Sequence, residues 1–408
     1  MAAGEEYTRH MGQYPVIFLS LKSAKQPTFE MAYLSLVDVI INEYERHSYV
    51  LQSTALSIGQ KELYTQIMNR RAEDSDYAKA IAFLSKCLEQ HHGKKTVILL
   101  DEYDVPLENA YFEGFYDRMI SFIRSLFESA LKTNDSLELA VITGCLRISR
   151  ESIFTGLNNL RIISVLNDHY AEYFGFVQDE VDAMLDYYGI AEKGEEVKKW
   201  YDGYLFGSTE VYNPWSVINY VDSAVSQAVS FPRPYWSNTS SNSIVRELIQ
   251  NEDSRAKAEN EHLISGGTIE KQIHEEITYG DIHQSQDNLW NFLFFTGYLK
   301  AVSQRFEVDT IYLTMKIPNA EIGYIYRNTI REWFEQRIKA EDFTPMYRAV
   351  LEGDDQTFES IVKRHLSESI SYFDSEERFY HGFLLGLLSG LQNYDMLSDR
   401  ESGDGRPD

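Results

Sequence analysis

The sequence predicts an α/β fold with a parallel sheet in about its first 175 residues. Three short apolar runs, at 16–21, 96–100 and 137–142, have the unbroken hydrophobicity of buried strands. Helical patterns of apolar residues separate these runs, and the strongest lies between Phe115 and Ala130. Strands that alternate with helices form parallel sheets with right-handed crossovers, so the order of these elements predicts the fold class.

The elements of this α/β part follow one another along the chain. The first strand comes after Pro15, and apolar residues from Phe29 to Tyr44 then recur at helical spacing. A second amphipathic helix runs from about Tyr77 to Gln90, and Gly93 ends it. Residues 161–166 are a candidate for a fourth strand.

From about Val177 the pattern becomes mainly helical. We expect helices at 180–188 and 195–200, an aromatic and turn-rich stretch at 200–239, mostly helical sequence at 243–300, a hairpin or edge strand at 306–316, a helix from Pro318, and a C-terminal helix at 379–391. That last helix has Gly382, Gly386 and Gly390 on one face, which favours the close approach of another backbone.

Composition excludes several classes of protein. The chain has 38 Lys and Arg against 63 Asp and Glu, a net charge of −25, so a generic basic coat for nucleic acid is excluded, although a local basic cleft is not. Its two cysteines, Cys87 and Cys145, exclude a disulfide scaffold. No apolar run reaches the roughly 20 residues that span a bilayer. The N-terminus also lacks the apolar region of a signal peptide. We therefore expect a cytoplasmic protein that does not contact a membrane.

The sharpest local signal is the stretch 96–104, an apolar strand that ends in Asp101 and Glu102. This places two carboxylates at the carboxyl edge of a parallel sheet, where ligands bind. In P-loop NTPases the first such acid holds Mg²⁺, and the second can orient the attacking water. An acid pair after a strand can also simply cap a helix, and the residues alone favour the two interpretations about equally.

The next predicted strand adds polar candidates. It ends in Thr143, which suits a side chain that senses a γ-phosphate, and Arg147 and Arg150 follow at a distance that could reach phosphate. A solvated helix face explains the two arginines equally well. The phosphate loop G-x-x-x-x-G-K-[ST] does not occur, and its nearest approach, at 93–96, precedes a strand and is predicted to be a turn. The predicted sheet also lacks the strand that should carry this loop.

The aromatic stretch at 200–236 has two possible roles. Its Trp and Tyr side chains could stack on bases. Few Lys or Arg residues accompany them, so packing in a core or a domain interface is favoured. The histidines form no zinc-binding pattern.

Many short stretches, in the same order, resemble one bacterial family: the AAA-ATPase-like proteins with a C-terminal PD-(D/E)XK nuclease-like domain. The matching stretches are Tyr14–Ser20, Ile98–Pro106, Thr143–Asn159, Glu172–Phe176, Trp200–Tyr204, Tyr212–Ser216, Trp236–Ser240, Leu293–Tyr298, Phe379–Gly386 and Arg400–Gly403. The resemblance covers nearly the whole chain.

This resemblance implies roles for individual residues. Asp101 and Glu102 look like the Walker B acids, with Asp101 on Mg²⁺ and Glu102 as the base that orients water. Thr143 takes the sensor position, and Arg147 is a second phosphate contact. The expected cofactors of the full-length family are ATP and Mg²⁺.

The resemblance also indicates a chain truncated at both ends. In such proteins the P-loop precedes the position of Tyr14, and here it is absent. At the other end, Gly403 to Asp408 resembles the stretch that leads to the first metal-binding Asp of the nuclease-like domain. Asp408 would be that ligand, but the Glu-x-Lys strand that follows it in the family is missing.

These inferences predict three domains: an AAA-ATPase-like α/β core without its P-loop strand at 1–175, a helical lid and winged-helix-like region at 176–300, and a mixed linker with the first part of the nuclease-like domain at 301–408. ATP binding and hydrolysis in the full-length relative would be coupled to the nuclease-like module. Hydrolysis by this chain is expected to be absent or very slow. The alternative is a non-catalytic interaction or regulatory module that docks a protein partner or DNA. An incomplete sheet also predicts self-association.

Overall fold

The computed structural model describes residues 4–145, 160–226, 231–236, 254–274, 286–329 and 344–369. The chain divides into two units, and each is described by itself. Unit 1 comprises Met1–Ser164 and Ile273–Thr296, and unit 2 comprises Val165–Gln272 and Gly297–Asp408.

Unit 1 is built on a three-stranded parallel sheet. Its strands are β1 (Val16–Ser20), β2 (Thr96–Asp101) and β3 (Leu137–Ile142), in the order β1-β2-β3. All three predicted strands and their parallel direction are thereby confirmed. The fourth strand expected at 161–166 does not form, and that prediction is wrong. Residues 160–163 are exposed, and no strand of the described chain pairs with them, so their apolar side chains are not buried in a sheet.

Helices connect these strands. In chain order they are α1 (Glu5–Thr8), α2 (Phe29–Arg46), α3 (Ile58–Met68), α4 (Asp74–Tyr77), α5 (Ala80–His92), α6 (Val105–Phe112), α7 (Tyr116–Phe127) and α13 (Gln286–Phe295), with short turns η1 (Lys22–Ala24), η2 (Ser48–Gln52) and η3 (Glu128–Lys132). Helix α5 ends at Gly93, whose φ of 67° lies in the left-handed region that glycine accepts without strain, as the sequence predicted.

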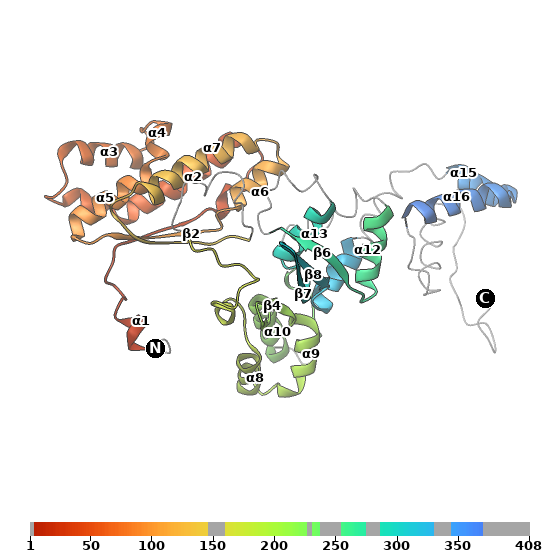
Figure 1. Cartoon of the computed structure of the whole chain (residues 1–408). Coiled ribbons are helices and arrows are strands. Elements are labelled where there is room, and N and C mark those ends of the chain that lie inside the picture. The colour runs from red at the N-terminus through yellow and green to blue at the C-terminus, as the bar shows by residue number, and fades with distance from the viewer. Residues whose placement is uncertain are drawn as a thin grey trace. The chain divides into compact units, whose positions relative to one another are not determined.

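One face of the sheet is covered by helices. Helix α2 contacts β1, helix α5 contacts β2, and Figure 1 shows α2, α5 and α7 together on one side of the sheet. The strand side chains on that side are buried: Ile17, Leu19, Ile98 and Leu100. These residues alternate along β1 and β2 because successive side chains of a strand point to opposite faces.

Unit 2 combines helices with short antiparallel strand pairs. Its elements are η4 (Ala171–Tyr173), α8 (Gln178–Tyr187), η5 (Ala191–Lys193), α9 (Gly194–Tyr201), β4 (Tyr204–Phe206), β5 (Thr209–Val211), α10 (Pro214–Ser226), α12 (Ser254–Ile264), β6 (Ile269–Ile273), β7 (Lys300–Glu307), β8 (Thr310–Lys316), helical residues 320–329, α15 (Thr344–Glu352) and α16 (Asp355–Ser369).

Two small sheets occur in the described part of unit 2. Strands β4 and β5 form one, and β6-β8-β7 form the other, in which β7 and β8 are an antiparallel hairpin. The predicted hairpin and the helix after Pro318 are confirmed. Strand β6 lies where mostly helical sequence was expected. Its buried residues Ile269, Lys271 and Ile273 alternate with the period of a strand, and the Lys271 ammonium lies 2.7 Å from the Glu259 carboxylate.

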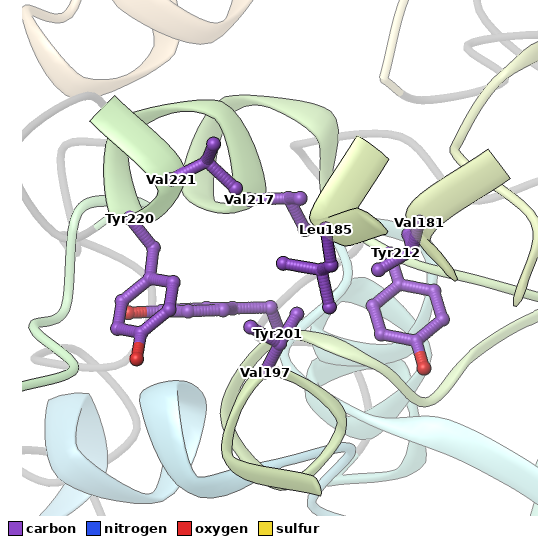
Figure 2. Packing of buried hydrophobic residues seen from close by; sticks show 8 residues of the cluster. All are labelled: Val181, Leu185, Val197, Tyr201, Tyr212, Val217, Tyr220 and Val221. Carbon is purple, nitrogen blue, oxygen red and sulfur yellow. The ribbon is translucent and has the colours of Figure 1, made fainter. Parts of the chain in front are cut away.

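The aromatic stretch contributes to a core in unit 2. Tyr201, Tyr212 and Tyr220 are buried, and Figure 2 shows them with the aliphatic side chains of Val181, Leu185, Val197, Val217 and Val221. These three rings are therefore packed inside the unit, where they cannot stack on bases. Trp215, which follows Pro214, is instead half exposed.

Among the helices that the structure describes, none is both long and apolar enough to cross a bilayer.

Candidate functional site

The predicted site residues Asp101 and Thr143 meet at the carboxyl edge of the unit 1 sheet. Asp101 is the last residue of β2 and pairs in register with Ser20 of β1. Thr143 directly follows β3, and its backbone N–H donates to Leu100 O at 2.9 Å. The Thr143 hydroxyl donates to Asp101 Oδ1 at 2.5 Å. Parallel strands bring their carboxyl ends together, which is why residues 42 positions apart form this contact.

Glu102 leaves the strand with an unusual backbone. Its φ of 54° lies in the left-handed region, where a residue with a Cβ costs about 1 kcal/mol or more. Its carbonyl accepts a hydrogen bond from Val105 N at 3.2 Å, which starts the turn into α6. Its Oε2 atom is buried, and no residue of the described chain hydrogen-bonds to it. A buried carboxylate oxygen without a donor is costly, so this oxygen is suited to accept a bond from a ligand or a water.

Asp104 is a third acid of this edge, and the sequence reasoning did not select it. It is only 2% exposed, and its Oδ2 accepts a hydrogen bond from Cys145 N at 2.9 Å. Its carbonyl accepts from Glu108 N at 2.9 Å, so the backbone of Asp104 also begins α6. The signal for it was present in the sequence, because Asp101 and Asp104 are three residues apart in the loop between a strand and a helix. The pKa of Glu108, one turn further along α6, is raised by burial.

Gly144 lets the two loops approach each other. A Cβ at this position would lie 2.6 Å from Asp104 Oδ1 and 2.6 Å from the Tyr103 ring. No real Cβ tolerates such distances, so only glycine fits between the β2 and β3 loops. Thr143 therefore supplies a hydroxyl to Asp101, and the next residue, Gly144, allows the β2 and β3 loops to lie close together.

The donor set fits a magnesium ion that shares its coordination with a ligand. Mg²⁺ binds through one or two carboxylates, several waters and substrate phosphates, seldom through an all-protein cage. No group of three or more His, Cys, Asp or Glu side chains in the described chain is placed to hold a metal ion by itself. Asp101 could supply one carboxylate, with Thr143 holding it in orientation. Arg147 and Asp408 lie outside the described residues.

The two edges of the sheet differ. At the outer edge of β1, Glu43 of α2 accepts a hydrogen bond from Phe18 N at 2.8 Å, and Arg46 and His47 bond to Val16 O at 2.5 and 3.1 Å. Burial alone would raise the pKa of Glu43, but hydrogen bonds from His47, Arg46 and Phe18 lower it. Side chains thus occupy part of the β1 edge, at Val16 and Phe18.

At the outer edge of β3, no further strand pairs within the described part of the chain. Thr143 turns both its N–H and its C=O towards the β2 side, so Ala140 and Ile142 direct their backbone groups away from β2. Apolar side chains are also exposed on one face of the sheet: Leu139 and Val141 of β3 are 56% and 45% exposed, and Phe18 of β1 is 50% exposed. Parallel sheets are normally covered on both faces, so this edge and face have the character of an incomplete sheet.

Comparisons with known proteins find similarity over part of the chain. Residues 1–154 match the AAA-ATPase-like family, described as "Predicted AAA-ATPase". An uncharacterized protein in the vnfD 5' region of Azotobacter chroococcum mcd 1 is 31% identical over 159 residues. The match covers 38% of this chain, which spans only 29% of that protein. No solved structure matches. Asp101, Glu102 and Thr143 all lie within the segment, residues 1–154, that matches this family model.

Proposed function

We propose that unit 1 is the nucleotide-binding part of an ATPase-like protein. The hydrogen bond between Thr143 and Asp101, at the carboxyl edge of a parallel sheet, carries this proposal. In it, Asp101 holds Mg²⁺ and Glu102 positions the attacking water. The single hydroxyl proton of Thr143 orients the Asp101 carboxylate in the nucleotide-free site and would turn to the γ-phosphate when nucleotide is bound. Arg147 is assigned to a second phosphate contact on sequence resemblance alone.

The environment of Glu102 supports its assigned role. A group that positions water must present an acceptor that the protein has not already used. Glu102 Oε2 is such an acceptor within the described chain. The left-handed backbone of Glu102 adds support, because strained residues persist where a particular side-chain direction is needed. The bound Mg²⁺ would supply charge stabilisation for the phosphates.

The proposal includes a missing part. The printed sequence has no glycine-rich phosphate loop, whose backbone amides and Lys make most contacts to the phosphates. We assign that loop to a further parallel strand that pairs with the free edge of β3, next to Thr143. The unpaired edge and the exposed Leu139 and Val141 support this assignment. Without such a strand, hydrolysis by this chain is absent or very slow.

The remaining part of the proposal concerns the C-terminal region. Coupling to a nuclease-like module, with Asp408 as its first metal ligand, rests on the sequence resemblance alone.

Titration of the purified chain with a fluorescent ATP analogue and Mg²⁺ tests the nucleotide site. We expect weak, saturable binding, with a dissociation constant on the order of 1 mM, that requires Mg²⁺. Asp101→Ala should abolish it, and Thr143→Val should weaken it because the orienting hydroxyl is lost. Asp135→Asn, at an exposed carboxylate of unit 1 outside the site, is the matched control and should bind as the unmodified chain does.

The opposite outcome favours the second candidate function. Binding that is absent, or that survives Asp101→Ala, would reject the assignment of Asp101. The exposed apolar face of the sheet would then support a non-catalytic module that docks a protein partner.

A further inference from the structure

Glu321 is a carboxylic acid enclosed entirely within unit 2. It lies in the helical residues 320–329 and has no exposed surface. The Ser216 hydroxyl lies 3.0 Å from its Oε1 and 2.9 Å from its Oε2. The backbone N–H of Trp236 donates to Oε1 at 2.9 Å. One side chain thus joins three segments: the first turn of α10, residues 231–236, and residues 320–329.

Residues 231–236 depend on two such buried side chains. At one end the Tyr201 hydroxyl bonds to both the N–H and the C=O of Arg233, at 3.1 Å each. At the other end Glu321 holds the Trp236 amide, and the Trp236 ring packs against Tyr298 with centroids 4.9 Å apart. Glu321 is the only titratable carboxyl among these described anchors, so its charge affects how the segment is held.

No described Lys or Arg forms an ion pair with Glu321. Among the described residues, Tyr201 and Tyr204 interact with it electrostatically, and burial raises the pKa of both hydroxyls so that they stay neutral. Burial likewise raises the pKa of Glu321 to about 7, although hydrogen bonds from Trp236, Ser216 and Tyr235 oppose this effect. An ionised Glu321 would be a buried charge with hydrogen bonds but no counter-ion, which is unfavourable.

The chemistry of Ser216 allows both protonation states. A hydroxyl can donate and accept, whereas a backbone N–H can only donate. When Glu321 carries a proton, its O–H can donate to Ser216 Oγ while its other oxygen accepts from Trp236 N. When Glu321 is ionised, Ser216 turns its own proton towards the carboxylate. The three groups therefore stay within hydrogen-bond distance in both states. Their bonds to the ionised carboxylate are stronger, whereas the cost of the buried charge opposes ionisation.

We propose that Glu321, Ser216 and the Trp236 amide form a proton-responsive latch that holds residues 231–236, tight when Glu321 is protonated and looser when it is ionised. This inference is independent of the proposed nucleotide function. A carboxyl in the unfolded chain ionises near its ordinary pKa of 4.5, whereas Glu321 in the folded unit holds its proton until about pH 7. Between these values only the folded state binds the proton, so the stability that the latch contributes falls as pH rises through this window.

Hydrogen exchange measured by mass spectrometry between pH 5 and pH 8 tests the latch, after correction for intrinsic exchange. In the unmodified chain, protection of residues 213–226 and 231–236 should fall with rising pH. Glu321→Gln carries a permanent neutral amide that can bond to both Ser216 and Trp236. It should keep its protection, and the difference between the two proteins should change by roughly 100-fold over this range.

Two controls complete the experiment. Glu352→Gln, at an exposed position of α15, should show the pH dependence of the unmodified chain. Ser216→Ala removes a donor that favours the ionised form and should move the midpoint to higher pH, whereas Ser226→Ala on the exposed end of α10 should not. The same pH dependence in Glu321→Gln and the unmodified chain, or an unmoved midpoint in Ser216→Ala, would overturn the proposal.

Discussion

The two units of this chain contain acidic groups whose surroundings are opposite. In unit 2, Glu321 has no exposed surface, and donors from two other segments reach its carboxyl oxygens. In unit 1, Glu102 lies at a sheet edge, has a left-handed backbone and keeps a buried oxygen that no described residue bonds. The fully bonded acid stabilises its own unit. The acid with an unused oxygen costs stability, which is typical of groups that act on a ligand.

Removing the side chain of Glu321 or of Glu102 should change the stability of the two units in opposite directions. Glu321→Ala leaves the Trp236 N–H and the Ser216 hydroxyl without their acceptor and opens a cavity, so it should destabilise unit 2 by about 3 kcal/mol. Glu102→Gly relieves a left-handed backbone and should stabilise unit 1 by about 1 kcal/mol. Hydrogen exchange of peptides from α10 and from β2 reads the two units separately. Destabilisation of unit 1 by Glu102→Gly would contradict the interpretation of Glu102 as a strained functional residue.

A substitution beside the site in unit 1 should have an effect of intermediate size on stability. Gly144→Ala places a Cβ against Asp104 and the Tyr103 ring, and should cost about 2 kcal/mol in unit 1 while lowering nucleotide affinity. Urea unfolding and the ATP-analogue titration measure the two effects. Gly59→Ala is the control, because a Cβ there meets nothing within 4 Å. Equal behaviour of the two variants would mean that the loops around Gly144 can separate without consequence.

The smallest effect on stability is expected on the open face of the unit 1 sheet. Lysine at both Leu139 and Val141 should change the free energy of unfolding by less than about 0.5 kcal/mol, because both side chains are half exposed. Self-association should nevertheless decrease, since the exposed apolar face loses its main residues. Light scattering after size exclusion measures this change. Val302→Lys, at a half-exposed position of β7, should leave the association as it is, and an unchanged double variant would show that another surface is responsible.

The sequence predicted the parallel sheet of unit 1 and two residues at its carboxyl edge, Asp101 and Thr143. The apolar runs of β1, β2 and β3 identified the strands, and parallel pairing then placed Asp101 beside Thr143. It did not find Asp104, because a single acid in a loop looks like any helix cap until its contact with Cys145 N is known.

The Glu321 network could not be predicted, for a related physical reason. Ser216, Trp236 and Glu321 come from segments up to 105 residues apart, and no local pattern records that their polar groups meet in an apolar interior. Strand β6 was missed because its alternation spans only five residues, one of them a lysine whose charge is neutralised by Glu259. Tertiary contacts decide such elements, and these are not visible in short windows of sequence.

The side chains bonded along β1 affect which edge of the unit 1 sheet can pair with another strand. With Phe18 N and Val16 O already bonded to Glu43, Arg46 and His47, a strand added to this sheet pairs more readily beside β3 than beside β1. A sheet with one unpaired edge can add strands only at that edge. A sheet with two unpaired edges can add strands on both sides and elongate into a fibre. Glu43 and Arg46 of α2, with His47 after it, thus hinder edge-to-edge pairing of two copies along β1.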